Sequence, residues 1–406
     1  MLSTIGIYGW ETIEPVILAA MASKHAVLLV GTHGAAKTDG AFALIKAVAG
    51  PQANVQKYDV PNLQAEELLG YPNPADLIAG QPMSYIPTPI SIWGKQGILL
   101  DELNRAHFMT QSKVVELIRE RSIMGMPTEV EYVFAAVNPP ASYGALYMEL
   151  ALASRFVTVE VPDLTHFPET TLVEILNSEI KSDTGSLQGI METVREATIS
   201  PEDKHSLQRF VAQIAKLLQK ELTTTDTDPG YCVRSMRMLY DLLESSEKLQ
   251  ALSPEYAAMM EADTILDLVM STVPEVWGVT QRIVDKNNLS AKVKVLINDF
   301  KLGSAVTSSS DIEDFLALDL TTEDTLAWGV SVCDKVNEIS NSMKLTKVVK
   351  QVISKMEEVP EEVANAILIS LLKRASSLDM LDLEKYRMTD EGILEMIKDV
   401  FNLGDK

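Results

Sequence analysis

Cysteine is scarce in this chain of 406 residues, which holds only Cys232 and Cys333. Two widely separated cysteines supply neither a disulfide framework nor the clustered spacing of a metal site, so we expect a reducing compartment. Long apolar runs are also missing, because none reaches the roughly 18 residues that a membrane-spanning helix requires. The N-terminus lacks a charged segment followed by an apolar one. We therefore expect a cytoplasmic protein that makes no membrane contact.

Basic side chains are outnumbered, with 35 Lys and Arg against 57 Asp and Glu and a formal net charge of -22. Such a surface repels phosphate backbones on average, which argues against nucleic acid as a partner. Aromatic residues make up only 6% of the chain. The hydrophobic share of 46% and the charged share of 23% are typical of a globular chain. Its length allows two or three domains.

A glycine-containing loop follows the apolar run at residues 26–30 and precedes a helical pattern. The loop consists of Gly31, Thr32, His33, Gly34, Ala35, Ala36, Lys37 and Thr38. A buried strand that turns into a helix through such a loop is typical of a P-loop, whose backbone N–H groups bind nucleotide phosphates. Lys37 would contact the β and γ phosphates, and the Thr38 hydroxyl would bind Mg²⁺.

Ala36 departs from the usual P-loop pattern. Glycine is used at this position because the backbone bends tightly against phosphate. The alternative interpretation of the loop is a turn that carries a lysine by chance.

A second apolar run, Gly97–Leu100, ends in two consecutive carboxylates. Such a run is typical of a buried parallel strand whose C-terminal end carries acidic side chains into a ligand site. Asp101 would then hold the Mg²⁺ shell, and Glu102 would polarise the attacking water as general base. The alternative is a strand that ends at a solvated acidic turn, but the P-loop upstream favours a Walker B motif.

Two further apolar runs adjoin polar residues of interest. Tyr132–Val137 precedes Asn138, whose amide can hydrogen-bond the attacking water or the γ-phosphate. The alternative is an Asn that only starts a turn before proline. Arg155 precedes the run Phe156–Val161 and is either an ordinary surface charge or a finger for the γ-phosphate of a neighbouring subunit.

The remaining patterns indicate helices and connecting segments. Residues 11–24 carry apolar side chains at i, i+3 and i+4, which predicts an amphipathic helix before the P-loop strand. Residues 70–90 are rich in Pro and Gly and predict an exposed insertion, with a hairpin as one form it could take. Residues 169–246 show helical spacing without strand runs. The polar run at 303–310 is typical of a linker.

Together these motifs resemble AAA+ ATPases of the MoxR type, in a RavA-like subgroup, over roughly residues 5–250. The most specific segment is Leu-Leu-Asp-Glu-Leu-Asn-Arg-Ala at residues 99–106. The other segments are Tyr8-Gly9-Trp10, the P-loop, Val137-Asn138-Pro139, Ser154-Arg155-Phe156 and Gly230–Ser235.

The resemblance implies roles for individual residues. Gly9 would belong to the nucleotide pocket together with the P-loop, and Asn138 would act as sensor 1. Arg155 would be the arginine finger that acts in trans. Arg234 lies in a segment similar to sensor 2 and would contact the γ-phosphate from the lid, although Val233 stands where the family usually has Pro. RavA-type ATPases tolerate Ala at the position of Ala36, so slowed rather than absent turnover is expected.

We expect a fold of the α/β P-loop NTPase (AAA+) class with a parallel five-stranded sheet. The expected domains are an AAA+ nucleotide-binding domain at 1–163, an all-α lid at 164–250, and a helical C-terminal region at 251–406 with a linker at 303–310.

The expected function is hydrolysis of ATP with Mg²⁺ as cofactor in an oligomeric ring, and the resemblance implies a homo-hexamer. The ring would remodel or activate a protein partner, such as a protein with a von Willebrand A domain. Two alternatives stay open from the residues alone: a nucleic-acid motor of the restriction type, and a nucleotide-gated scaffold with little hydrolysis.

Overall fold

The computed structural model describes residues 1–139, 145–178, 187–223, 230–260 and 262–308, together with Val332, Val336 and residues 367–371. Contacts between residues divide the chain into two units, Met1–Lys294 and Val295–Lys406. The first unit contains the sheet and all of the candidate site residues named above. Among the described helices, none is both long and apolar enough to span a membrane.

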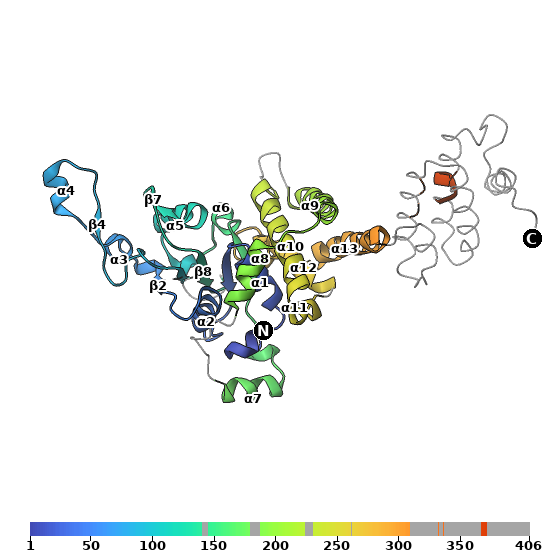
Figure 1. Cartoon of the computed structure of the whole chain (residues 1–406), viewed down its shortest axis with the longest axis horizontal. Coiled ribbons are helices and arrows are strands. Elements are labelled where there is room, and N and C mark those ends of the chain that lie inside the picture. Colours follow the sequence, from blue (N-terminus) through green and yellow to red (C-terminus); the bar gives the residue numbers. More distant parts are fainter. Residues whose placement is uncertain are drawn as a thin grey trace, which may run out of the picture. The chain divides into compact units, whose positions relative to one another are not determined.

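A parallel five-stranded sheet forms the centre of the first unit, as the sequence predicts (Figure 1). Its strands, in spatial order, are β2 (Val55–Asp59), β5 (Gly97–Asp101), β8 (Tyr132–Val137), β1 (Ala26–Val30) and β9 (Phe156–Glu160). Every residue of β1 and β8 is buried. Continuous apolar runs are typical of strands that are covered on both faces, which explains why the sequence predicts β1 and β8 as buried strands.

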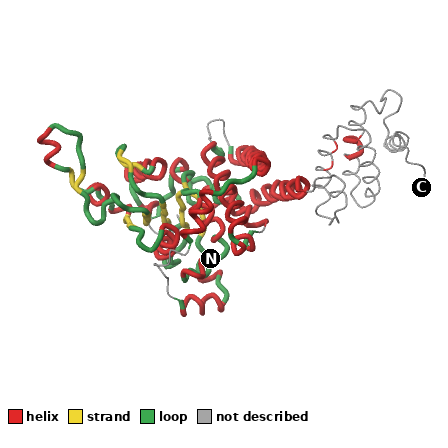
Figure 2. The backbone as a smooth tube through the Cα atoms, in the orientation of Figure 1, coloured by secondary structure: helices red, strands yellow, loops and turns green. Residues whose placement is uncertain are grey.

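Helices cover both faces of the sheet (Figure 2). One face is covered by α1 (Glu14–Ala22) and α2 (Lys37–Ala49), with α8 (Gln188–Glu196) and α10 (Val233–Leu252) packed on them. The other face belongs to a core cluster that includes side chains of α5 (Phe108–Glu120), α6 (Leu150–Ala153) and the segment after η5 (Pro274–Trp277). The sheet is therefore the middle layer of three.

The helix before the P-loop strand differs from the prediction of an amphipathic helix over residues 11–24. Helix α1 is shorter, and all 9 of its side chains are buried. It contacts the sheet through β1 and β9, and it also contacts α8, α10 and α12 (Ala262–Met270). A helix surrounded by other elements is apolar on all sides, which the spacing of its apolar residues alone does not reveal.

The insertion expected at residues 70–90 is a hairpin-bearing arm, defined here as residues 60–92. Its elements are η2 (Val60–Asn62), α3 (Ala65–Leu69), β3 (Tyr71–Pro72), α4 (Pro74–Ala79) and β4 (Tyr85–Ile86), and β3 pairs with β4 in antiparallel fashion. Figure 1 shows α4 at the outer end of the arm, away from the sheet. A second hairpin, Ser122–Pro127, is formed by β6 (Ser122–Ile123) and β7 (Met126–Pro127).

The described residues that follow the sheet are mainly helical. Between residues 164 and 250 they form η4 (Leu164–His166), α7 (Glu169–Asn177), α8, α9 (Pro201–Leu222) and α10. The chain then returns to the sheet, because the N–H of Thr158 donates to the carbonyl of Ser271 at 2.8 Å and the N–H of Met148 donates to that of Val279 at 2.8 Å. The expected boundaries at 163 and 250 stay predictions.

The expected linker at 303–310 is helical over its described part. Helix α13 (Lys286–Ser308) continues through residues 303–308. A single glycine, Gly303, costs a helix only about 1 kcal/mol relative to alanine, which does not suffice to end it. The helical character expected for the C-terminal region is seen in α11 (Pro254–Ala258), α12 and α13.

Replacing Tyr256 with Phe tests how the helical layer is held. Tyr256 on α11 is fully buried, and its hydroxyl contacts the carbonyl of Pro15 on α1 at 3.0 Å and the hydroxyl of Ser246 on α10 at 3.1 Å. Tyr256→Phe should lower the free energy of unfolding by about 1–2 kcal/mol, because buried polar atoms lose their partner. Urea unfolding measures this. Tyr147→Phe, at a side chain that is 46% exposed, is the control, and equal losses in both variants would contradict the account.

Candidate nucleotide-binding site

The candidate site lies at the C-terminal edge of the sheet. Strands β1, β8 and β5 are neighbours and run parallel, so their carboxyl ends meet at one edge. The P-loop follows β1, Asp101 ends β5, and Asn138 follows β8. Open α/β sheets place their ligands outside this edge. The fold therefore gathers the three motifs that the sequence presents separately.

Lys37 connects the P-loop to the neighbouring strand β8 through its side chain. Its ammonium donates to the carbonyl oxygens of Gly31 and Thr32, both at 2.7 Å, and to Oδ1 of Asn138 at 3.3 Å. Burial lowers the pKa of Lys37, while the carboxylates of Asp101 and Glu102 act in the opposite direction. The lysine thus joins the loop after β1 to the end of β8.

The loop backbone explains the preference for glycine at the position of Ala36. Ala36 precedes α2 with φ 53° and ψ 23°, which is the left-handed region. This conformation costs a residue with a Cβ roughly 1–2 kcal/mol. Gly34 also has a positive φ of 82°, and among the described residues nothing lies within 4 Å of the point where its Cβ would stand. The loop keeps an open concave side toward the cavity, and this cradle fits a phosphate group.

Both Walker B carboxylates are engaged by cations. Oδ2 of Asp101 lies 2.5 Å from Nζ of Lys57 on β2, and Oδ1 accepts the N–H of Glu102 at 3.0 Å. Oε1 of Glu102 lies 2.9 Å from Nη1 of Arg105 in η3 (Leu103–Arg105). Arg105 also contacts Nε2 of His33 at 3.2 Å, so the exposed P-loop histidine meets the Walker B segment. If Glu102 acts as a general base on water, its ion pair with Arg105 has to open.

Asn104 is a positioning residue that residue-by-residue reasoning missed. Its side chain is 1% exposed, and Nδ2 donates to the carbonyl oxygens of Asn138 at 2.8 Å and Leu146 at 3.1 Å. Asn138 is itself 3% exposed. Asn104 therefore fixes the end of β8 against the segment after β5, which holds the Asn138 amide against Lys37. Its only sequence signal was its place in the segment 99–106.

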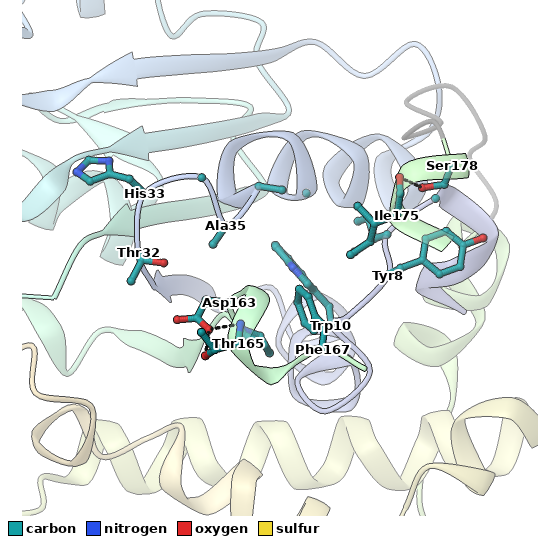
Figure 3. A pocket seen from close by; sticks show the side chains of 16 residues that line it. Tyr8, Trp10, Thr32, His33, Ala35, Asp163, Thr165, Phe167, Ile175 and Ser178 are labelled. Atoms are coloured by element: carbon teal, nitrogen blue, oxygen red, sulfur yellow. Dashed lines mark hydrogen bonds between the residues drawn. The ribbon is translucent and has the colours of Figure 1, made fainter. Parts of the chain in front are cut away.

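An apolar cavity of about 580 Å³ adjoins the P-loop. Its lining includes Tyr8, Trp10, Phe167 and Ile175, and Figure 3 shows Trp10 and Phe167 next to each other. A Cβ on Gly9 would stand 2.5 Å from the Phe167 ring. Gly9 thus leaves room for the aromatic wall of the pocket, and it lines a second cavity together with Gly31 and Thr32 of the P-loop. Flat apolar walls beside a phosphate cradle suit a nucleotide base.

The structure brings Arg155 and Arg234 together. They lie near the N-terminal end of β9, whereas the P-loop follows the C-terminal end of β1. Arg155 precedes β9, which runs parallel to β1 with Phe156 opposite Ala26. A strand of five residues spans roughly 16 Å, so Arg155 and the P-loop lie at opposite ends. Nη1 of Arg234, near the start of α10, donates to the Ser154 hydroxyl at 3.3 Å. Neither arginine is brought to the P-loop of its own chain.

The environment of Arg155 is that of a partly buried cation. Burial lowers the pKa of Arg155, and the neighbouring Arg234 and Arg119 lower it further. Its guanidinium donates to the carbonyl of Ala151, while its Nε is buried without a hydrogen-bond partner among the described residues. Two adjacent guanidinium groups repel each other, so an anion placed between them would be favoured.

The donor set of the site fits Mg²⁺ bound together with phosphates. Among the described residues, no group of three or more His, Cys, Asp or Glu side chains gathers to hold a metal ion. Mg²⁺ is held in such sites by one or two protein oxygens with substrate phosphates and waters. The hydroxyl of Thr38, directly after Lys37, and the carboxylate of Asp101 are oxygens of this kind.

Comparisons with known proteins agree with the fold. The chain is similar to the crystal structure of a "putative ATPase" from Cytophaga hutchinsonii ATCC 33406, with a TM-score of 0.50 and 16% identity over 72% of this chain and 90% of that one. The crystal structure of NtrX from Brucella abortus in complex with ATP aligns with 91% of this chain and 67% of that one at 14% identity, with a TM-score of only 0.28. No protein-family model and no curated protein matches the sequence. The fold is that of an α/β P-loop NTPase of the AAA+ type.

Glycine substitutions at adjacent positions test the strain in the P-loop. Ala36→Gly should raise the free energy of unfolding by up to about 1 kcal/mol, because it removes the cost of the left-handed conformation. Ala35 lies outside the positive-φ region, so Ala35→Gly should lower it by about 0.5–1 kcal/mol through the entropy of the unfolded chain. Urea unfolding compares the two. A loss of stability in both variants would show that Ala36 is not strained.

Removing Lys57 tests its competition with Mg²⁺ for Asp101. Lys57→Met should lower the Mg²⁺ concentration needed for half-maximal ATP binding by about two- to fivefold, which corresponds to the strength of a partly exposed ion pair. Calorimetric titration with ATP at several Mg²⁺ concentrations measures it. The matched control is Lys24→Met, which breaks a surface pair with Glu131 at 3.1 Å. An unchanged Mg²⁺ requirement would mean that Lys57 does not compete with Mg²⁺ for the Asp101 carboxylate.

Proposed function

We propose that this chain is an Mg²⁺-dependent ATPase of the MoxR type whose sites are completed between copies in a ring. One observation carries the proposal. Lys37, Asp101, Glu102 and Asn138 meet at one edge of the sheet, whereas Arg155 and Arg234 lie together at the other. A single chain therefore offers a phosphate cradle and, separately, a pair of guanidinium groups. A neighbouring copy can bring the second set to the first.

Each residue then has a chemical task. Lys37 and the loop N–H groups bind the β and γ phosphates, and Asn138 orients the γ-phosphate or the attacking water. Glu102 accepts the proton of that water. Thr38 and Asp101 would hold Mg²⁺, which when bound neutralises charge on the phosphates. Arg155 and Arg234 of the next copy stabilise the charge that develops on the γ-phosphate.

Trp10 and Phe167 would enclose the adenine base in the apolar cavity. Gly9 and Gly40 support this arrangement, since a Cβ at either would stand 2.5 Å from an aromatic ring, that of Phe167 or of Trp10. A base held between aromatic and aliphatic walls loses its water and gains stacking contacts. The assignment explains why the phosphate-binding loop and the N-terminal segment 8–10 lie beside one cavity.

An interface in which one face contacts a different face of the next copy generates a closed ring when its rotation closes, and we propose such a ring here. The number of copies proposed is six, as the resemblance implies. ATP turnover in this ring would remodel or activate a protein client, for which a protein with a von Willebrand A domain is the candidate. The acidic surface disfavours the alternative of a nucleic-acid motor. Cytoplasmic location is part of the same proposal.

A nucleotide-gated scaffold with little hydrolysis is the second candidate. The ion pair between Glu102 and Arg105 favours it, because the guanidinium contacts the carboxylate that would otherwise act on water. The two candidates share ATP binding and assembly and differ only in turnover.

Steady-state turnover of the wild type beside Glu102→Gln distinguishes these candidates. For the ATPase, the wild type should hydrolyse ATP and Glu102→Gln should lose at least about a hundredfold in turnover, as expected for a general base. Glu102→Gln should still bind ATP and assemble, which nucleotide titration and light scattering measure. If both proteins bind ATP and assemble but neither hydrolyses it, the scaffold is supported and the ATPase is contradicted.

A further inference from the structure

Exposed apolar side chains gather on the arm and the second hairpin. Those on the arm are Tyr71, Ile78, Met83, Ile86 and Ile90, with Ile78 89% exposed. Met124, at the tip of the second hairpin, is 65% exposed. The hydroxyl of Tyr85 on the arm lies 3.8 Å from Sδ of Met124, so the two hairpins touch. Concentrated apolar exposure of this kind marks a binding surface rather than a stabilising one.

A groove of about 430 Å³ lies where the two hairpins meet. Leu68, Val114 and Ile123 belong to its lining and are themselves at least nine-tenths buried. Tyr85 and Met124 line it as well. The groove therefore has an ordered apolar floor that continues into the exposed side chains of the arm.

The charged side chains that line the groove, among the described residues, are acidic. The arm contains Glu66, Glu67 and Asp76 and no Lys or Arg. Glu66 and Glu116 line the groove. The Glu116 carboxylate accepts the N–H of Gly125 at 2.8 Å and that of Met124 at 3.1 Å. Hydrogen bonds from backbone N–H groups, chiefly that of Gly125, lower the pKa of Glu116, so this side of the groove stays negative.

We propose that the groove between the arm and the second hairpin docks a client polypeptide segment that combines apolar side chains with Lys or Arg. The apolar floor takes the aliphatic or aromatic side chains, and Glu66 and Glu116 pair with the basic ones. A second copy of this chain fits less well, because its net charge of -22 would meet a negative surface. The inference rests on the proposed function in one respect, which is that the chain acts on a protein client.

The arm and the second hairpin are also close in the chain to the strand that ends at Asp101 and to Glu102, which follows it. The arm begins directly after β2, which pairs with β5 and whose Lys57 contacts Asp101. The second hairpin follows α5, which itself follows the Walker B segment and η3. A client bound here would contact the two segments that flank β5 and its carboxylates in the chain.

Peptide binding tests the proposal with the full chain and three labelled probes. The probes are four repeats of Arg-Leu-Ser, of Glu-Leu-Ser and of Arg-Ser-Ser, and fluorescence anisotropy gives the affinity. The Arg-Leu-Ser probe should bind the wild type at least tenfold more tightly than either other probe, a difference of about 1.4 kcal/mol. Added salt should weaken this binding.

Two variants at the groove and the adjoining arm, together with a control, localise the binding. The double variant Ile86→Ser with Met124→Ser, and separately Glu66→Lys, should weaken binding of the Arg-Leu-Ser probe about tenfold. Ile283→Ser, at a side chain that is 67% exposed outside the groove, should leave it unchanged. Circular dichroism and ATP turnover check that the variants fold and keep their basal activity.

Several outcomes overturn the proposal: no binding of the Arg-Leu-Ser probe, equal binding of the three probes, or equal weakening in Ile283→Ser. A change of assembly state in the double variant without loss of probe binding would make the surface an interface between copies, which also overturns it. Probe binding at the groove by a chain that does not hydrolyse ATP would leave this inference standing while the proposed function fails.

Discussion

The parallel register of β1, β8 and β5 is the constraint on which the candidate site depends. The contact of Lys37 with Asn138 requires the pairing of β1 with β8, and the contact of Asn104 with the Asn138 carbonyl requires that of β5 with β8. A slip of one residue in a strand would turn its side chains to the other face of the sheet. Burial on both faces prevents such a slip, so the packing of the core and the geometry of the site have one cause.

The strands and the site edge could be predicted because each signal is local. Continuous apolar runs define β1, β5 and β8, and they are followed directly by the P-loop, Asp101 and Asn138. Other features depend on packing between distant segments. Phe167 reaches the P-loop cavity only because Gly9 leaves room for its ring, and α1 is buried on all sides because later helices cover it. Arg234 stands beside Arg155 because α10 begins next to Ser154, a contact that no spacing in the sequence reveals.

Charge links the two parts of the proposed composite site, which are the nucleotide-binding residues of one copy and the arginines of the next. Asp101 and Glu102 form ion pairs within the chain with Lys57 and Arg105, whereas Arg155 lies near two like charges, Arg234 and Arg119, which lower its pKa in addition to burial. The phosphates of ATP would favour both arrangements at once, since they attract the arginines of a neighbour. Nucleotide binding and assembly would then be coupled by the same ions, as linkage requires of two events that favour each other.

The central claim is that one active site needs two chains, and mixing two inactive variants tests it most directly. Lys37→Ala removes the phosphate cradle and keeps both arginines, while Arg155→Ala keeps the cradle and removes the finger. Each variant alone should lack ATP turnover. The account predicts that co-assembled mixtures regain turnover, because some sites then combine an intact cradle with an intact Arg155. Mixtures that assemble but stay inactive would contradict the claim that Arg155 acts on the nucleotide of a neighbouring copy.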